Sequence, residues 1–336
     1  MATIRVLESF AEPRSTTNPY ITQLATALKA EPRLEVAFFS WRRALVGPYD
    51  VFHAHWPDAL LAGRNPLTRL AKRLAAALLL LRLIVRRTPV VRTMHNVTPH
   101  EKSRAAGWFD HALMRRTRIR ILLNDAHSSD SDTYVIPHGD YRDWYAKFPR
   151  AELIPGRIGF AGLIRPYKGV EDLVRAFRSL SEDDETVSLS IVGMPRTEKL
   201  RSNIEEGVAK TPRTSVTFAY VTDEDLVNAL TEAELVALPY HHMTNSGAAL
   251  AALSLDRHVL LPRVPAAETL QAEVGATWVT LFDGPLLPEH LGSALRAAKA
   301  VPAGAKVAFH DRDWKDAGTR HWHAFSAALG HDETTP

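Results

Sequence analysis

Short apolar runs alternate along this chain with longer stretches in which apolar residues recur every three or four positions. The first pattern predicts buried strands, and the second predicts amphipathic helices. In the first half, strands are predicted at residues 3–8, 36–40, 51–55, 90–95, 119–124 and 133–136. Helices are predicted there at residues 19–30, 65–85 and 108–117.

The second half repeats the alternation. Strands are predicted at residues 157–161, 188–192, 216–218, 235–238, 258–261 and 277–281. Helices are predicted at residues 170–179, 198–210, 223–232, 246–255, 266–273, 289–299 and 311–329. Strands that alternate with helices predict an α/β fold with a parallel, doubly wound sheet in each half. A chain of 336 residues is long enough for two such domains, and we place their junction near residues 150–155.

Composition narrows the class of protein. Hydrophobic residues make up 46% of the chain and charged residues 24%, which is typical of a globular protein with a full core. The chain has no cysteine, so disulfides and thiolate metal sites are excluded. The N-terminal residues predict a strand and show no apolar signal region, so the expected location is the cytoplasm.

Charge is distributed unevenly, although the net charge is only +3. Residues 1–150 contain 23 Lys and Arg against 13 Asp and Glu, whereas residues 151–336 contain 18 against 25. The two halves therefore predict different partners. The basic half lacks a nucleic-acid-binding motif, so nucleic acid is not an expected partner and an anionic membrane surface is the better one.

A leucine-rich segment in the basic half has the composition for such a surface. Its apolar run, residues 74–81, is too short to cross a hydrocarbon core, which needs about 20 residues. A helix with cationic ends can instead lie in the interface of an anionic leaflet. The predicted membrane-binding residues are Arg69, Lys72, Arg73, Arg86 and Arg87. The alternative is an ordinary buried helix with snorkelling arginines, and the two interpretations can hold on different faces.

A glycine-rich turn with two cations lies between a predicted strand and helix in the second half. Gly162, Arg165 and Lys168 precede the helix predicted at residue 170. Arg165 offers a planar fork for phosphate oxygens, Lys168 a mobile charge, and the helix start exposed N–H groups. This predicts a site for a diphosphate. The spacing resembles the donor-diphosphate motif of GT-B nucleotide-sugar glycosyltransferases, and the alternative is a solvated basic turn.

A second polar turn follows the strand predicted at residues 235–238. Thr244, Asn245, Ser246 and Gly247 precede a helix, so they can cap it or present its N–H groups to a phosphate. Asn18 and His138 belong to polar clusters at other predicted strand ends and complete the predicted donor-binding set.

Further motifs extend the resemblance over nearly the whole chain. They comprise residues 17–20, 49–58, 88–96, 99–101, 138–144, 163–171, 245–247 and 312–314. In this order they resemble the glycolipid β-mannosyltransferase family of xanthan-type exopolysaccharide assembly. That family implies a GT-B fold, in which two Rossmann-like domains face a cleft. The turn at Asp256, Arg257 and His258 departs from the family pattern.

The resemblance implies a separate role for each domain. Residues 1–150 would bind the acceptor, residues 151–310 the nucleotide sugar, and a helix at residues 311–330 would cross back to the first domain. The implied enzyme is an inverting transferase that moves mannose from GDP-mannose onto a polyprenyl-diphosphate-linked oligosaccharide. It would be peripheral on the inner face of the plasma membrane. A UDP-sugar transferase of the same fold and a non-catalytic adaptor that binds a sugar nucleotide and a membrane are the alternatives.

An inverting transfer requires a general base that faces the acceptor hydroxyl and groups that stabilise the leaving diphosphate. Asp58, His95 and Glu101 are the predicted bases, because each lies at a strand end or in the loop that follows. Arg165 and Lys168 can neutralise the diphosphate without a metal, so we expect no cofactor. His53 and His55 point to one face of a strand, but the sequence offers no third metal ligand at a convincing spacing.

Overall fold

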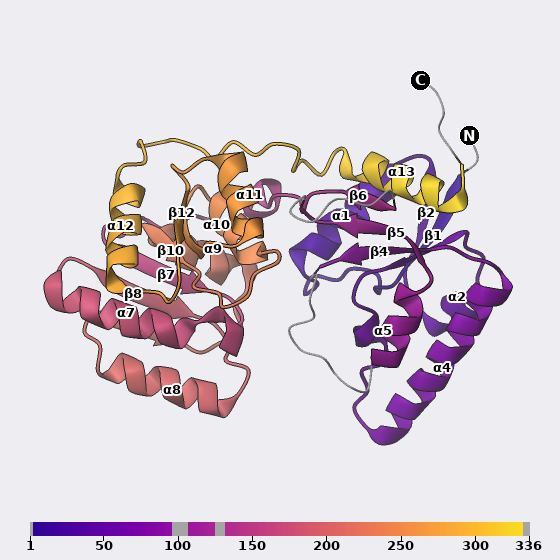
Figure 1. The fold of residues 1–336 in the computed structure, drawn as a ribbon, viewed down its shortest axis with the longest axis horizontal. Coiled ribbons are helices and arrows are strands. Elements are labelled where there is room, and N and C mark those ends of the chain that lie inside the picture. Colours follow the sequence, from indigo (N-terminus) through magenta and orange to yellow (C-terminus); the bar gives the residue numbers. More distant parts are fainter. Residues whose placement is uncertain (1–2, 96–106, 125–131, 332–336) are drawn as a thin grey trace. The chain divides into compact units, whose positions relative to one another are not determined.

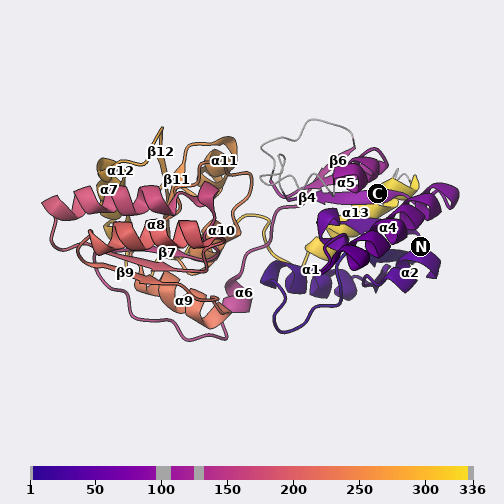
Figure 2. The same ribbon diagram turned by 90° about the horizontal axis from the view of Figure 1, so that it is seen from below.

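The structure is a computed structural model that describes residues 3–95, 107–124 and 132–331. The chain divides into two compact units, seen in Figures 1 and 2. Unit 1 contains residues 1–139 and 311–336, and unit 2 contains residues 140–310.

Unit 1 is built on a six-stranded parallel sheet of order β2-β1-β3-β4-β5-β6. Its strands are β1 (Ile4–Glu8), β2 (Leu34–Ala37), β3 (Val51–Ala54), β4 (Val90–Met94), β5 (Thr117–Leu122) and β6 (Thr133–Val135). Its helices are α1 (Pro19–Ala30), α2 (Trp41–Val46), α3 (Pro57–Leu60), α4 (Pro66–Val85), α5 (Gly107–Met114) and α13 (Ala317–Leu329). Helices α1 and α13 cover one face of the sheet, while α2, α4 and α5 cover the other (Figure 1).

Unit 2 has a six-stranded parallel sheet of order β12-β11-β10-β7-β8-β9. Its strands are β7 (Arg157–Ala161), β8 (Ser188–Val192), β9 (Thr214–Thr217), β10 (Leu235–Ala237), β11 (His258–Pro262) and β12 (Val279–Phe282). Its helices are α6 (Arg142–Tyr145), η1 (Pro166–Lys168), α7 (Val170–Asp183), α8 (Glu198–Ala209), α9 (Asp223–Glu232), α10 (Gly247–Ser254), α11 (Pro265–Val274) and α12 (Pro288–Lys299). Helices α7, α8 and α12 pack on one face and α9 on the other (Figure 2).

Local sequence explains where the main helices start. Asn18 accepts a hydrogen bond from the backbone N–H of Tyr20, and Pro19 occupies the first turn of α1. Asn65 and Pro66 begin α4 in the same way, with the Asn65 side chain bonded to the N–H of Thr68. A side chain that accepts from the first turn satisfies an N–H without an intrahelical partner, and proline lacks that N–H.

The predicted α/β class with two parallel sheets is confirmed. The strand predicted at residues 36–40 was misplaced, because Ser40 caps the unpredicted helix α2 by accepting from the N–H of Arg43. Residues 140–150, assigned from sequence to the first domain, pack in unit 2. There Tyr141 and Tyr145 enter the core and Trp144 donates to Asp223.

Candidate active site

In each unit the strand order reverses at one point, and ligands of doubly wound sheets bind there, outside the carboxyl ends of the strands. In unit 2 the reversal lies between β7 and β10, because the chain passes from β7 to β8 and β9 and then returns to the other side of β7. The two predicted phosphate motifs follow these two strands. The N–H of His241 donates to the carbonyl of Tyr167 at 2.8 Å, so the loops are tied together.

Gly169 shapes the first of these loops. Its φ is 67°, in the left-handed region, and it is the N-cap of α7. A Cβ at this position would lie 2.1 Å from the carbonyl oxygen of Pro239, so no other residue fits without moving the second loop. This close approach places the N-terminus of α7 beside the turn that follows β10.

Arg165 directly precedes η1, and Lys168 is the last residue of η1. Nζ of Lys168 lies 5.5 Å from the ring centroid of Tyr240 and 5.9 Å from that of Phe160. Burial lowers the pKa of Lys168, and the charge of Arg165 lowers it further, while Tyr167 opposes both. A partly desolvated ammonium beside a guanidinium is stabilised by a bound anion.

The second predicted phosphate motif lies at the start of α10. Ser246 is its N-cap and accepts from the N–H of Ala249 at 3.0 Å. Thr244 is buried, and Asn245 and Gly247 are half-buried beside it. Ser246 thus has a structural role, while the first turn of α10 presents backbone N–H groups at its positive end.

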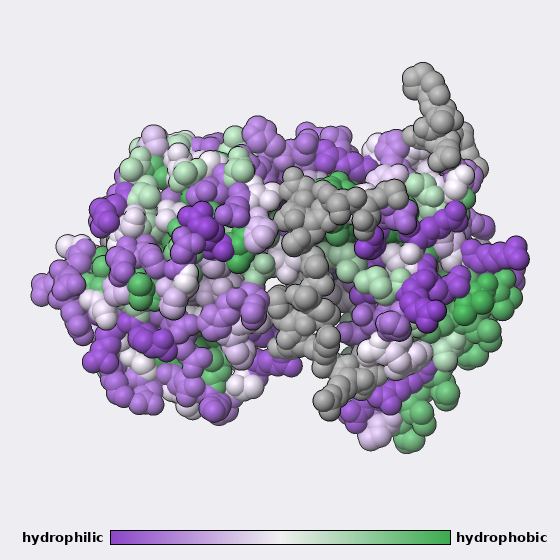
Figure 3. Space-filling view, in the orientation of Figure 1, coloured by the Kyte–Doolittle hydropathy of each residue, from purple (hydrophilic) through white to green (hydrophobic). Residues whose placement is uncertain are grey.

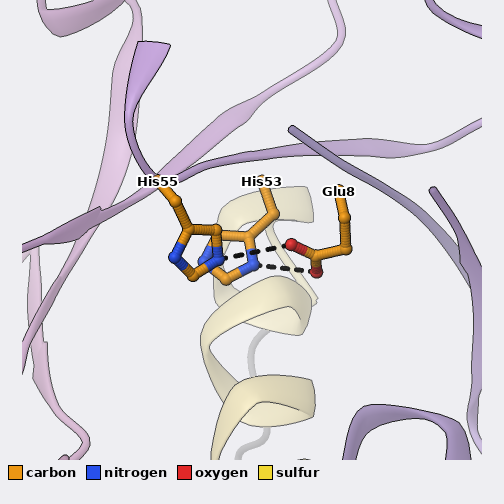
Figure 4. A group of neighbouring side chains, drawn as sticks. All are labelled: Glu8, His53 and His55. Atoms are coloured by element: carbon orange, nitrogen blue, oxygen red, sulfur yellow. Dashed lines mark hydrogen bonds and ion pairs between the residues drawn. The ribbon is translucent and has the colours of Figure 1, made fainter. Parts of the chain in front are cut away.

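In unit 1 the strand order reverses between β1 and β3, and a buried group of polar side chains lies there (Figure 4). Nδ1 of His53 lies 2.9 Å from Oε1 of Glu8, and Nε2 of His55 lies 3.3 Å from Oε2. All three side chains are completely buried. Nε2 of His53 lies 2.8 Å from the hydroxyl of Thr93 in β4.

His95, one of the predicted bases, continues this group. Its Nε2 lies 3.0 Å from Nδ1 of His55, and the Trp56 ring stacks on its imidazole with centroids 3.8 Å apart. Burial lowers the pKa of His95 well below its usual value, and the neighbouring His55, His138, His53 and Arg92 add to this. The imidazole is therefore neutral near pH 7, as a general base must be.

The structure also gathers the other predicted residues of unit 1. Asn18 caps α1 next to Tyr20, whose ring lies 4.5 Å from that of His138 and 5.3 Å from that of His95 between centroids. The carbonyl of His138 accepts from Arg312 at 2.8 Å. Burial lowers the pKa of His138 to about 4. Tyr20 is thus the side chain around which these residues meet.

Asp58 lies on α3, and its carboxyl is influenced by Asp110 and Arg92 rather than by the histidines. Burial raises the pKa of its carboxyl and Asp110 raises it further, while Arg92, which forms an ion pair with Asp110, opposes both. Asp58 stays a predicted base. Glu101, the third predicted base, lies outside the described residues.

Glu8, which the sequence analysis missed, is the third group beside His53 and His55. Among the described residues, these three are the ones whose side-chain atoms lie close enough together to meet a metal ion, within 4.8 Å of one another. The 2.9 Å separation of His53 and Glu8 is a hydrogen-bond distance, so we assign the group to hydrogen bonding. The sequence signal that could have identified Glu8 is an acidic residue at the end of the first buried strand.

Helix α4 has two apolar faces. Ala76, Leu79, Leu80 and Leu83 are buried against unit 1. The opposite face carries side chains that are between 51% and 79% exposed: Leu67, Leu70, Leu74, Leu78, Leu81, Ile84 and Val85. We call these seven residues the leucine stripe, and they form a green patch at the lower right of Figure 3.

Basic residues adjoin the leucine stripe. Arg69, Arg73, Arg86 and Arg87 are exposed, whereas Lys72 is half-buried and donates to the carbonyl of Ala62. Arg86 and Arg87 also line a surface cavity of about 660 Å³ with Arg5 and Arg82. No helix in the described part of the chain is both long enough and apolar enough to span a membrane.

The sequence and fold of this chain are similar to those of known proteins. Residues 155–296, most of unit 2, match the family model described as glycosyl transferases group 1. Among solved structures, an Escherichia coli protein described as trehalose-6-phosphate, bound with UDP-2-fluoro glucose, has a TM-score of 0.59 at 11% identity over 98% of this chain and 96% of that one. A proposed UDP-N-acetylglucosamine 2-epimerase from Listeria monocytogenes has a TM-score of 0.57 at 15% identity, over 99% and 98%. The two parallel sheets and these structural similarities define the GT-B fold, with two Rossmann-like domains, and the family model shows that unit 2 is similar to group 1 glycosyl transferases.

A sequence comparison is more specific. The GDP-mannose:glycolipid 4-β-D-mannosyltransferase of Xanthomonas campestris pv. campestris is 42% identical over 98% of this chain and 94% of its own length. The chain belongs to the glycosyltransferase family of that enzyme.

Proposed function

We propose that this glycosyltransferase transfers mannose from GDP-mannose, with inversion, to a polyprenyl-diphosphate-linked oligosaccharide in exopolysaccharide biosynthesis. The observation that carries the proposal is the 42% identity to the Xanthomonas mannosyltransferase over almost the whole of both chains. At this similarity the acceptor is expected to be a glycolipid as well.

Unit 2 would bind the donor at the reversal between β7 and β10. Arg165 and Lys168 supply positive charge, and the N-termini of α7 and α10 supply N–H groups, so the diphosphate can be neutralised without a metal. The lowered pKa of Lys168 supports this, because an anion would restore the favourable surroundings that burial removes.

Unit 1 would bind the acceptor and supply the base. One of the three predicted bases, His95, Asp58 or Glu101, would remove the proton of the attacking hydroxyl, while the diphosphate leaves from the opposite face of the sugar. The leucine stripe and the adjacent arginines would hold unit 1 on an anionic membrane surface, the inner face of the plasma membrane, where a polyprenyl acceptor resides. The arginine-lined cavity could accommodate anionic lipid headgroups at that surface.

The decisive experiment incubates the protein with a synthetic polyprenyl-diphosphate oligosaccharide and either GDP-mannose or UDP-glucose. Each reaction is run with and without EDTA. We expect transfer from GDP-mannose alone, a β-linked mannose in the NMR spectrum of the product, and no loss of rate with EDTA. Transfer from the UDP-sugar, or an α-linked product, would contradict the assignment of donor or mechanism. Binding of GDP-mannose without transfer to any lipid acceptor would indicate the adaptor.

Nucleotide preference can be measured independently by thermal shift. A ligand that binds the folded state raises the melting temperature according to its concentration relative to Kd. GDP is expected to raise it more than UDP at equal concentration. Equal shifts would remove the support for a guanine nucleotide.

A further inference from the structure

A continuous path of side chains leads from Glu8 to His95. Oε2 of Glu8 lies 3.3 Å from Nε2 of His55, an ion-pair distance at which the two atoms are not aligned for a hydrogen bond, and both atoms are buried without another hydrogen-bond partner among the described residues. Nδ1 of His55 lies 3.0 Å from Nε2 of His95. Glu8 and His55 come from two adjacent strands at the point where the strand order reverses, and His95 follows the next strand.

The chemistry of these groups determines where the protons lie. With Glu8 ionised at rest, its carboxylate can only accept, so each histidine that faces it carries its proton on the nitrogen nearest to it. For His55 this nitrogen is Nε2, so its Nδ1 must accept from Nε2–H of His95. Neutral His95 then carries its lone pair on Nδ1. His53 lies on a separate branch, which ends at the hydroxyl of Thr93.

We propose that Glu8 and His55 form a proton relay behind His95, which is the general base of the transfer. This proposal rests on the function proposed above. His95 would be the catalytic residue, while His55 and Glu8 are positioning residues that fix its tautomer and take up its proton.

The transfer step balances as follows. The acceptor O–H bond breaks, its proton goes to Nδ1 of His95, and its electron pair forms the new bond to C1 of the sugar. The bond from C1 to the diphosphate oxygen breaks, and the nucleoside diphosphate leaves with that electron pair. The Nε2 proton of His95 passes to Nδ1 of His55, and the Nε2 proton of His55 passes to Oε2 of Glu8. The proton returns by the same path to water when the product leaves.

Burial makes Glu8 a suitable end point. Burial raises the pKa of the Glu8 carboxyl, and His55 opposes the rise. Burial, aided by the neighbouring His53, lowers the pKa of His55 to about 4, although Glu8 opposes the fall. Among the described residues, the other titratable groups near the relay include Tyr20 on α1, Arg92 on β4, His138 after β6 and His321 on α13. A proton on Glu8 neutralises a buried charge, whereas a proton kept on either histidine creates one.

Glu8→Gln and His55→Asn test the relay, with His53→Asn as the matched control. His53 contacts the same carboxylate from the same strand but does not lead to His95. We expect Glu8→Gln and His55→Asn each to lower kcat about 100-fold or more, with little change in KM for the donor. The double variant should lose little more than either single variant, since the residues act as one unit. His53→Asn should lower the melting temperature and should reduce kcat much less than either relay variant, because it removes a contact to Glu8 but leaves the path from Glu8 to His95 in place.

A spectroscopic readout separates the relay from a merely structural role. In protein labelled with ¹⁵N-histidine, the ring shifts should report the Nε2–H tautomer for His55 and His95 in the wild type. Gln at position 8 offers one oxygen and one NH₂ group, so Glu8→Gln should change the tautomer of both rings. The acid limb of the kcat–pH profile should move in the same variant.

Three outcomes would overturn the relay. One is wild-type kcat in folded Glu8→Gln, with Asp58→Asn inactive instead. Another is an Nδ1–H tautomer for His95 in the wild type. The third is a stoichiometric metal ion whose binding requires Glu8, His53 and His55. Absence of transferase activity in the wild type, with the predicted tautomers intact, would count against the proposed function and leave the hydrogen-bonded path standing.

Discussion

Units 1 and 2 each contain a sheet of six parallel strands with one reversal of strand order, but the order differs: one strand lies beyond β1 in unit 1, and two strands lie beyond β7 on the corresponding side in unit 2. The side chains at the two reversals differ as well. In unit 2 the loops carry Arg165, Lys168 and the left-handed Gly169, and the helix N-termini lie beside them. In unit 1 the equivalent position holds Glu8, His53 and His55, all completely buried.

The roles proposed for the two sites account for the difference. An anionic diphosphate is bound by N–H groups and cations that a ligand can reach, so its site consists of loops. A proton is moved most readily between groups whose charged forms are disfavoured by burial, so its site lies between strands and under aromatic rings. Two parallel sheets of different strand order would thus support the two chemistries at the same kind of position, the point where the strand order reverses.

The largest expected effect is acid destabilisation of unit 1. Burial lowers the pKa of His53 and of His321 to about 3, and burial lowers the pKa of His138 to about 4. The unfolded chain binds protons below its histidine pKa of about 6.5 and the folded state does not, so stability falls as the pH drops through this value. Each such histidine lowers the free energy of unfolding by roughly 2 kcal/mol between pH 6.5 and pH 5.

Denaturant unfolding at pH 7.5 and pH 5, with hydrogen exchange resolved by segment, measures this effect. Amides of β1, β3 and α13 should lose protection at pH 5 before those of β7 and β10. Unit 2 contains one comparable histidine, His258, whose pKa is lowered by burial. Equal loss of protection in the two units would contradict the contrast.

The next largest effect is on transition-state stabilisation at the proposed diphosphate site of unit 2. Arg165→Ala and Lys168→Ala should each remove about 2–4 kcal/mol of transition-state stabilisation, because each deletes a cation beside the leaving diphosphate. Steady-state kcat/KM with GDP-mannose measures it. Arg178→Ala is the matched control, since Arg178 lies on α7 in an exposed pair with Glu182. Wild-type turnover in either of the first two variants would exclude the diphosphate assignment.

The same contrast explains what the sequence could predict. Gly162, Arg165 and Lys168 lie within seven positions on one strand–turn–helix segment, so their spacing alone indicated a phosphate site. Glu8 lies 45 residues from His53, and His55 lies 40 residues from His95. Such partners meet only through the parallel pairing of β1, β3 and β4, which apolar periodicity predicts but whose register it leaves open.

Helix positions followed a similar rule. The bounds of α1 and α9 were predicted to the residue, because Asn18 and Thr222 are N-caps that the sequence displays. Short helices such as α2 and α3 were missed, since four to six residues contain too few turns for a periodic pattern.

A smaller effect should follow from changing Gly169. Gly169→Ala adds the cost of a left-handed residue, about 1–2 kcal/mol, and must also displace the carbonyl of Pro239. Gly304→Ala is the control, because Gly304 also has a positive φ, of 76°, but a Cβ there would meet nothing within 4 Å. We expect weaker GDP binding and a lower melting temperature for Gly169→Ala, and only the lower melting temperature for Gly304→Ala. Unchanged GDP affinity in Gly169→Ala would show that this glycine does not shape the donor site.

The smallest expected effect on stability concerns the leucine stripe of unit 1. Leu74→Gln with Leu78→Gln should change the free energy of unfolding by less than about 0.5 kcal/mol, because both side chains already face solvent. Flotation with anionic vesicles should nevertheless show weakened binding, since the apolar face that enters the interface is interrupted. Leu153→Gln in unit 2 is the control for a partly exposed leucine outside the stripe.

Charge contributes separately to this binding. Replacing Arg69, Lys72, Arg73, Arg86 and Arg87 by Gln should remove the preference for anionic over neutral vesicles. High salt should act in the same direction, because the Debye length falls from about 10 Å at 0.1 M to about 3 Å at 1 M. If the Gln variants of the stripe and of the basic residues both float as wild type does, α4 is a helix with an incidental apolar face. Unit 1 would then reach its lipid-linked acceptor through another surface.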